Sequence, residues 1–202
     1  LRLFRWGREA TIPEDEWAAA DGLLVTRYHI SPAMVARLGR ARIVVRYGVG
    51  FDNLDLPALG AAGIPACNVP DYGTNEVADH AIGLMLALRR GITHYWDALH
   101  DDPIKGWGWG AALVKRLKGQ RFGIVGLGRI GTAAALRARA FGFEVAFYDP
   151  YLAVGHEIAF GFERAETLEA LLASSDIVSL HCPANEETTG MIDTAALAAI
   201  KP

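Results

Sequence analysis

The chain has 202 residues, of which 51% are hydrophobic and 21% charged, a composition that excludes an intrinsically disordered protein. Its formal net charge of −3 gives no electrostatic reason to bind nucleic acid or an anionic membrane, so neither partner is expected. No apolar run approaches the ~20 residues of a membrane-spanning helix. The two cysteines, Cys67 and Cys182, are far apart and the histidines show no metal-ligand spacing, which favours a cytoplasmic protein without a metal site.

Strands and helices are predicted to alternate through the first part of the chain. Short apolar runs favour buried parallel strands at residues 22–26, 42–46 and 64–69. Helix-starting signals occur around them, at Pro13, at Ser31-Pro32 and at Thr74. The last of these begins a long helix, from about Asn75 to Arg90, whose apolar positions Val77, Ala81, Leu84 and Leu88 fall at helical spacing. The alternation predicts a parallel α/β domain over residues 1–93.

Residues 101–118 interrupt this alternation. They are rich in turn-forming residues, with Trp107 and Trp109 as aromatic anchors, and predict a surface connection. The domain boundary is expected near residue 94, so that residues 94–202 form the second domain. A dinucleotide-binding domain usually has about six strands, more than we predict from residue 121 onward, so we expect this domain to be cut before its C-terminal end.

A glycine-rich motif organises the second domain. The apolar run Phe122–Val125 predicts a buried strand, and the helical run Thr132–Phe141 is rich in alanine and leucine. Between them Gly126, Gly128 and Gly131 form the pattern G-x-G-x-x-G. An acidic residue, Asp149, ends the next predicted strand at the distance of about 20 residues typical of dinucleotide-binding units.

The chemistry of a bound dinucleotide explains each position in this motif. Gly126 permits the tight turn out of the strand, Gly128 lets the backbone approach a pyrophosphate, and Gly131 lets the helix pack closely on the sheet. The free N–H groups at the helix start favour phosphate. Asp149 is expected to accept hydrogen bonds from the adenosine ribose and to repel a 2′-phosphate, because Pro150, Tyr151 and Leu152 provide no cation. The sequence therefore predicts NAD rather than NADP.

Several stretches resemble one family, the D-isomer-specific 2-hydroxyacid dehydrogenases. They are Arg46–Asn53, Asn68–Thr74, Glu76–His80, Gly126–Gly131, Tyr148–Pro150 and Ser179–Pro183. Two further runs, Arg139–Val145 and Phe147–Tyr151, look most like the C-terminal-binding-protein branch. The resemblance covers nearly the whole chain. It implies two Rossmann-like parallel-sheet domains, one flavodoxin-like and one dinucleotide-binding, with the active site in the cleft between them.

The resemblance also implies site residues. A substrate carboxylate would be held by residues after the second strand: Arg46, Tyr47, Gly48, Val49 and Gly50. NAD would be held by three segments that follow strands: Val125, Gly126, Leu127, Gly128, Arg129, Ile130 and Gly131; Asp149 and Pro150; His181, Cys182, Pro183, Ala184, Asn185 and Thr188. For His181 and Cys182, ordinary packing at a strand end remains an equal alternative, and His80 is more simply a packed helix residue.

The family's catalytic Arg, Glu and His are expected C-terminal to the segment that resembles Met191–Pro202, so we assign no catalytic residue. The leading hypothesis is an NAD-dependent enzyme that interconverts 2-keto acids and D-2-hydroxy acids, acting as a homodimer. The alternative is an NAD(H)-sensing protein that binds peptides, as the C-terminal-binding branch implies. A bare dinucleotide-binding remnant is a weaker third reading.

Overall fold

The structure, a computed structural model, describes residues 12–104, 106 and 114–201. Its contacts divide the chain into two compact units, Leu1–Gly73 and Thr74–Pro202. This division lies ahead of the boundary expected near residue 94, because the long helix that follows Gly73 packs within the second unit. Trp107 and Trp109, expected to be packing anchors, lie outside the described residues.

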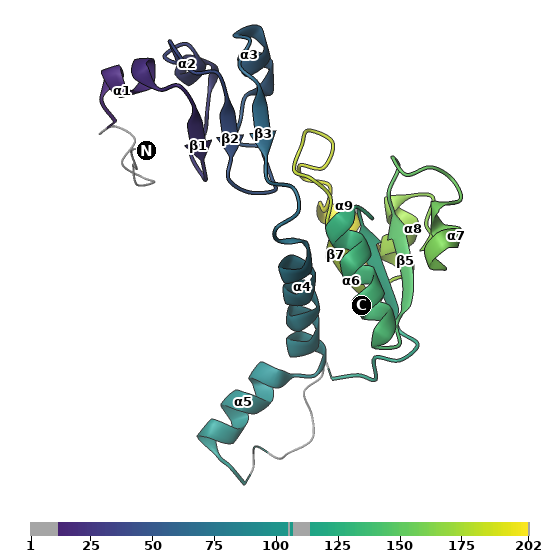
Figure 1. Ribbon diagram of the computed structural model, residues 1–202. Helices are drawn as coiled ribbons and strands as arrows, with labels where there is room; N and C mark the ends of the chain where they lie inside the picture. Colours follow the sequence, from purple (N-terminus) through teal and green to yellow (C-terminus); the bar gives the residue numbers. More distant parts are fainter. Residues whose placement is uncertain (1–11, 105, 107–113, 202) are drawn as a thin grey trace. The chain divides into compact units, whose positions relative to one another are not determined.

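The first unit contains a three-stranded parallel sheet in the order β1-β2-β3 (Figure 1). Its strands are β1 (Leu23–Val25), β2 (Val44–Arg46) and β3 (Ala66–Asn68), and its helices are α1 (Glu14–Ala19), α2 (Pro32–Val35) and α3 (Leu56–Ala61). All three strands lie where the apolar runs predicted them. Apolar side chains from these strands, helices and loops form the core of the unit: Trp17, Val25, Ile30, Val35, Leu38, Val44, Leu54, Leu59 and Ile64.

The second unit contains a four-stranded parallel sheet in the order β6-β5-β4-β7. Its strands are β4 (Arg121–Val125), β5 (Glu144–Tyr148), β6 (Glu163–Arg164) and β7 (Ile177–Leu180). Numbered within the unit, this order is 3-2-1-4, the first four positions of the Rossmann arrangement. The predicted α/β fold with parallel sheets is therefore confirmed. Sequence patterns missed β6, because two residues are too few to show a period.

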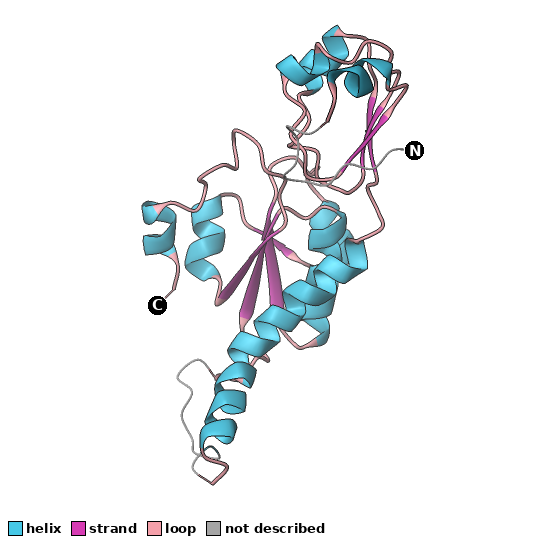
Figure 2. Ribbon diagram, turned by 90° about the vertical axis from the view of Figure 1, so that its left-hand side faces the viewer, coloured by secondary structure: helices cyan, strands magenta, loops and turns pink. Residues whose placement is uncertain are grey.

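Helices cover both faces of this sheet, as Figure 2 shows. The helices are α4 (Thr74–Arg89), α5 (Ile92–Asp101), α6 (Arg129–Ala140), α7 (His156–Phe160), α8 (Leu168–Ser174) and α9 (Thr194–Ala199). On one face α6 packs on β4 and β5 and also against α4. Its small residues Ala134, Ala135 and Ala138 are fully buried and allow this close approach. On the other face α8 packs on β4 and β5, and α9 packs on α8.

Helix α4 has two apolar faces. The face that packs against the second unit contains Ala78, Ile82 and Met85. The apolar positions at helical spacing in the sequence lie largely outside this core. The exposed fractions of Val77, Leu84 and Leu88 are 46%, 60% and 57%. The helical spacing was therefore correct, but it identified the exposed face rather than the buried one.

The structure has two local features that the sequence patterns did not predict. Helix α5 was not predicted, because the long helix was expected to end near Arg90 and residues 92–100, which mix aromatic and polar residues, were assigned to no element. Gly91 separates it from α4 in the left-handed conformation, with a φ of 61°. The last helix, α9, is capped by Asp193 rather than by its first residue, Thr194, because the Asp193 carboxylate accepts the N–H of Ala196 at 2.8 Å.

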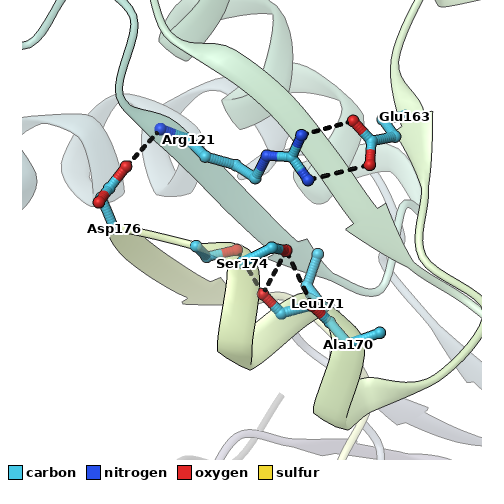
Figure 3. A network of polar contacts seen from close by, with 7 residues as sticks. Arg121, Glu163, Ala170, Leu171, Ser174 and Asp176 are labelled. Atoms are coloured by element: carbon cyan, nitrogen blue, oxygen red, sulfur yellow. Dashed lines mark hydrogen bonds and ion pairs between the residues drawn. The ribbon is translucent and has the colours of Figure 1, made fainter. Parts of the chain in front are cut away.

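Polar contacts tie the amino ends of the second sheet together (Figure 3). Arg121, the first residue of β4, reaches past β5 and pairs with both carboxylate oxygens of Glu163 on β6, at 2.9 and 2.6 Å. Its main-chain N–H donates to Asp176 at 2.8 Å, just before β7. Lys201 also contacts Asp176, at 3.2 Å. These contacts lie at the end of the sheet opposite the glycine-rich loop.

Candidate functional site

The three glycines of the motif have three different structural roles. Gly126 has a φ of +86°, and a Cβ there would lie 2.8 Å from the main-chain N of Cys182. A Cβ at Gly131 would overlap the carbonyl oxygen of Gly126. A Cβ at Gly128 would meet no atom within 4 Å. The fold therefore requires glycine at 126 and 131, whereas position 128 borders open space.

The start of α6 presents unpaired donors to this space. Within the described part of the chain, the main-chain N–H groups of Gly128, Arg129 and Ile130 have no hydrogen-bond partner. The first internal bond at this end runs from the N–H of Thr132 to the carbonyl of Gly128, at 2.9 Å. Free N–H groups at a helix N-terminus, together with the partial positive charge of the dipole, favour an anion such as a phosphate.

Asp149 lies beside the glycine-rich loop, after the end of β5. Its Oδ2 accepts the main-chain N–H of Leu127 at 2.9 Å, and its Oδ1 accepts the N–H of Tyr151 at 3.0 Å. Each carboxylate oxygen has further acceptor capacity. Asp149 can therefore accept two hydroxyl groups of a ribose without breaking the contacts that hold it.

The segment after β7 approaches the same loop. The N–H of His181 continues the sheet by donating to the carbonyl of Val125 at 2.8 Å. The His181 ring shares a hydrogen bond of 2.9 Å with the Ser179 hydroxyl, and burial lowers the pKa of His181 below its usual value. Cys182 lies 3.7 Å from Met191, sulfur to sulfur. Both residues thus have contacts within the chain, and these contacts do not assign either residue to the cofactor.

A tight turn follows these residues. Thr188 and Asn185 exchange hydrogen bonds, with the N–H of Thr188 donating to the Asn185 side chain and the N–H of Asn185 donating to the Thr188 hydroxyl, both at 3.0 Å. The Thr188 hydroxyl also donates to the carbonyl of Pro183 at 2.6 Å. Within the turn, Glu187 accepts a hydrogen bond from the phenol of Tyr151. That contact links the loops after β5 and β7 and raises the pKa of Tyr151.

The predicted carboxylate loop lies in the first unit, after β2. Asn68 on β3 braces it by donating to the carbonyl of Val49 at 2.7 Å. The guanidinium of Arg46 folds back over Gly48 and donates to the carbonyl of Tyr47 at 3.1 Å, while its Nε is buried without a partner. Among the described residues, the N–H groups of Val49 and Gly50 have no acceptor. These groups can bind an anion.

The second unit fits a dinucleotide in three respects: the open space at Gly128, the unpaired N–H groups that face it, and the carboxylate of Asp149. The decisive finding is that residues 82–202 match the model of the NAD-binding domain of the D-isomer-specific 2-hydroxyacid dehydrogenases. This chain belongs to that family. The resemblance identified from the sequence is confirmed, and NAD is the cofactor of the domain that the chain carries.

Individual relatives of this dehydrogenase family are similar over most of the chain. C-terminal-binding protein 1 of Caenorhabditis elegans is 39% identical over 165 residues, which are 77% of this chain and 22% of that protein. D-3-phosphoglycerate dehydrogenase of Mycobacterium bovis is 37% identical over 194 residues, which are 96% of this chain and 35% of that enzyme. The chain thus spans about a third or less of these relatives.

A solved dehydrogenase structure shows the same fold. D-lactate dehydrogenase from Aquifex aeolicus, complexed with NAD and lactic acid, superposes with a TM-score of 0.88 at 27% identity. The match covers 96% of this chain and 57% of that enzyme. None of the helices that the structure describes is both long and apolar enough to span a membrane.

The sequence did not predict the residues that support the loops expected to bind the cofactor. Arg164 contacts the main chain of Asp149, and Tyr151 and Glu187 join the loops after β5 and β7. No motif predicts these contacts, because each depends on a segment folding back towards another. The sequence distinguishes Arg164 in no way from the other basic residues, since the chain has 20 lysines and arginines.

Proposed function

We propose that this chain belongs to an NAD(H)-dependent oxidoreductase that interconverts 2-keto acids and D-2-hydroxy acids by hydride transfer. The observation that carries the proposal is the open, N–H-lined space between Gly128 and Asp149, in a chain that belongs to a dehydrogenase family. The nicotinamide ring, when bound, supplies or accepts the hydride. The residues of this chain hold the two reactants in place.

For the cofactor, the residues of the three loops have distinct roles. The start of α6 binds the pyrophosphate through its free N–H groups, and Asp149 binds the adenosine ribose. The loop after β7 borders the rest of the dinucleotide. The binding residues we propose are those predicted from the sequence: Val125, Gly126, Leu127, Gly128, Arg129, Ile130, Gly131, Asp149, Pro150, His181, Cys182, Pro183, Ala184, Asn185 and Thr188.

For the substrate, we propose that the loop after β2 binds the carboxylate. The N–H groups of Val49 and Gly50 are unpaired, and the guanidinium of Arg46 is adjacent. Main-chain N–H groups in a loop of this kind form anion-binding concavities. A bound carboxylate would also give the Arg46 guanidinium a stronger acceptor than the carbonyl that it now contacts.

The test uses the natural protein that contains this chain. NADH oxidation is followed with pyruvate, glyoxylate and hydroxypyruvate, and the stereochemistry of the product is determined. Turnover that yields the D-hydroxy acid supports the proposal. Binding of NADH without turnover of any 2-keto acid contradicts it.

A sensor function is the second candidate, and the similarity to C-terminal-binding protein 1 favours it. A sensor would bind NADH tightly, change its assembly state or peptide affinity when NADH binds, and turn over 2-keto acids slowly. Titrating NADH while measuring molecular mass by light scattering distinguishes the two functions. An enzyme needs no change in mass with NADH, whereas a sensor of this type does.

The proposed homodimer has support in exposed apolar side chains on α4 and α5. Leu84 and Leu88 on α4 are 60% and 57% exposed, and Ile92 and Trp96 on α5 are 55% and 66% exposed. Such a surface on two successive helices is typical of an interface. Leu84→Glu should halve the mass measured by light scattering, whereas Leu197→Glu on α9, a site 59% exposed, should not. The cytoplasmic location stays a prediction, which cell fractionation tests.

A further inference from the structure

One partly buried guanidinium holds the turn that carries Asp149. Arg164, on β6, donates from Nη1 to the main-chain carbonyl of Asp149 at 3.2 Å and from Nη2 to the carbonyl of Ala153 at 2.9 Å. Its Nε donates to Glu157 at 3.0 Å. The exposed fraction of the Arg164 side chain is only 13%. A single side chain therefore contacts the beginning, the middle and the end of segment 149–157.

The other face of this guanidinium rests on the core. The Cζ atom of Arg164 lies 5.0 Å from the centre of the Phe147 ring, which is fully buried in β5. Contact with an aromatic face is favourable for a cation that is partly removed from water. Arg164 thus packs on β5, the strand that leads directly into Asp149.

The charge of Arg164 is balanced within the same segment. Glu157 pairs with it through Oε2, and the N–H of Gly155 donates to Oε1 at 3.0 Å. The main-chain N–H of Glu157 itself, with further hydrogen bonds from Arg164 and Gly155, keeps the pKa of Glu157 below its usual value. The pair is therefore fully ionised at neutral pH. Because Glu157 occupies Nε and Nη2, the cation faces the main chain rather than a ligand.

These contacts place Arg164 behind Asp149. Among the described residues, the Asp149 carboxylate accepts hydrogen bonds only from main-chain donors. The carboxylate accepts the N–H groups of Leu127 and Tyr151, which belong to the loops after β4 and β5. The hydrogen bond from Arg164 to the main-chain carbonyl of Asp149 is a third contact that holds this residue. Without it, the turn after β5 would be free to shift, and the carboxylate would lose its orientation towards the glycine-rich loop.

We propose that Arg164, with Glu157 as its counterion, is the positioning residue that aligns Asp149 for the adenosine half of the dinucleotide. The inference rests on the proposed function, since it assumes that Asp149 binds the ribose. It assigns Arg164 no contact with the cofactor. Its effect is therefore confined to the adenosine end, whereas a general structural role would affect both ends.

The test compares ligands that contain or lack adenosine. In the natural protein, Arg164→Met should raise the Kd for NADH and for ADP-ribose by about tenfold, the equivalent of about 1.4 kcal/mol. The Kd for reduced nicotinamide mononucleotide should stay within about twofold. Arg164→Lys, which keeps the charge but cannot span two carbonyls and a carboxylate, should show an intermediate loss. If Arg164→Met does not fold, Arg164→Lys provides the same comparison.

Arg139→Met is the matched control. Arg139 also donates to a main-chain carbonyl, that of Phe160 at 2.5 Å, and also lies over an aromatic ring, that of Phe162 at 5.3 Å. It does not contact segment 149–157 among the contacts described. The control should therefore leave all three affinities unchanged, although it removes the same type of side chain.

Amide hydrogen exchange gives a readout in the absence of ligand. Arg164→Met should accelerate exchange at the N–H groups of Leu127 and Tyr151, which both donate to Asp149, and the control should not. Equal affinities in wild type and Arg164→Met, or equal losses for all three ligands, overturn the inference. A wild-type protein that binds neither NADH nor ADP-ribose refutes the proposed function instead, so the two failures are distinguishable.

Discussion

The main-chain N–H of Leu127 donates a hydrogen bond to Oδ2 of Asp149 at 2.9 Å. The glycine-rich loop after β4 and the acidic residue after β5 are therefore joined directly to each other. This contact fixes the carboxylate beside the free N–H groups of α6. Binding a dinucleotide then requires little rearrangement, and such pre-organisation lowers the entropic cost of binding.

The first prediction is that Asp149 sets the cofactor preference. The wild-type protein should bind NADH more tightly than NADPH, because a 2′-phosphate would meet a carboxylate. Asp149→Asn should weaken NADH binding by about tenfold or more, since a hydrogen bond to a charged group contributes about 1.5–3 kcal/mol. Asp149→Asn should also reduce the ratio of the NADPH Kd to the NADH Kd. Nicotinamide fluorescence titrations measure both constants, and Glu166→Gln, an exposed site on the same unit, is the control. Equal wild-type affinities for the two cofactors would refute the argument.

Much of this site could be predicted from the sequence, because its parts are local. Gly126, Gly128 and Gly131 lie in one turn, and the strands before and after them have clear apolar runs. The contacts of Arg164 and of the Tyr151–Glu187 pair could not be predicted, since they join segments whose approach depends on the path of the loops. Helix α4 illustrates the same limit. Its two apolar faces are equivalent in sequence, and only packing against α6 decides which one is buried.

The second prediction concerns Arg46. Arg46→Lys in the natural protein should raise the KM for 2-keto acids, because a lysine cannot reproduce the planar fork of donors. Arg46→Ala should lower kcat/KM by about tenfold or more, on the basis of about 1.5–3 kcal/mol for a charged contact. The Kd for NADH should stay nearly constant in both variants. Arg42→Lys, on an exposed residue that precedes β2, is the control. An unchanged kcat/KM in Arg46→Ala would remove Arg46 from the site.

The third prediction is a pH dependence that arises from His181. Burial lowers its pKa in the folded protein below the ordinary value of 6.5. The unfolded chain therefore binds a proton first as the pH falls, so His181 makes the protein less stable below about pH 6.5 than above it. His181→Gln should flatten the decrease in Tm between pH 7 and pH 5. His156→Gln, at an exposed site, should leave the slope unchanged. Identical slopes in wild type and His181→Gln would show that His181 is not buried as described.

The fourth prediction concerns the contacts at the amino ends of the strands. The hydrogen bond from the N–H of Arg121, with a further contribution from Lys201, lowers the pKa of Asp176 below 3.8. The stabilisation by Asp176 is therefore complete above about pH 4 and is lost as the pH falls through the lower, folded value. Asp176→Asn should lower the free energy of unfolding at pH 7, and the difference from wild type should shrink towards pH 3. Urea denaturation at several pH values measures it. A difference that does not depend on pH would indicate lost packing rather than lost charge.

The last prediction separates two glycines of one motif. Gly131→Ala places a Cβ against the carbonyl of Gly126, which is main chain and cannot move aside. It should destabilise the protein by about 1–3 kcal/mol or more, as expected for overpacking. Gly128→Ala places its Cβ in open space at a φ of −73°, which alanine adopts without strain. It should leave Tm nearly unchanged and yet raise the Kd for NADH by about tenfold or more, because the added methyl occupies the space assigned to the pyrophosphate. Thermal melts measure the Tm of both variants, and fluorescence titrations measure their Kd for NADH. Wild-type affinity in Gly128→Ala would mean that the dinucleotide does not lie against α6.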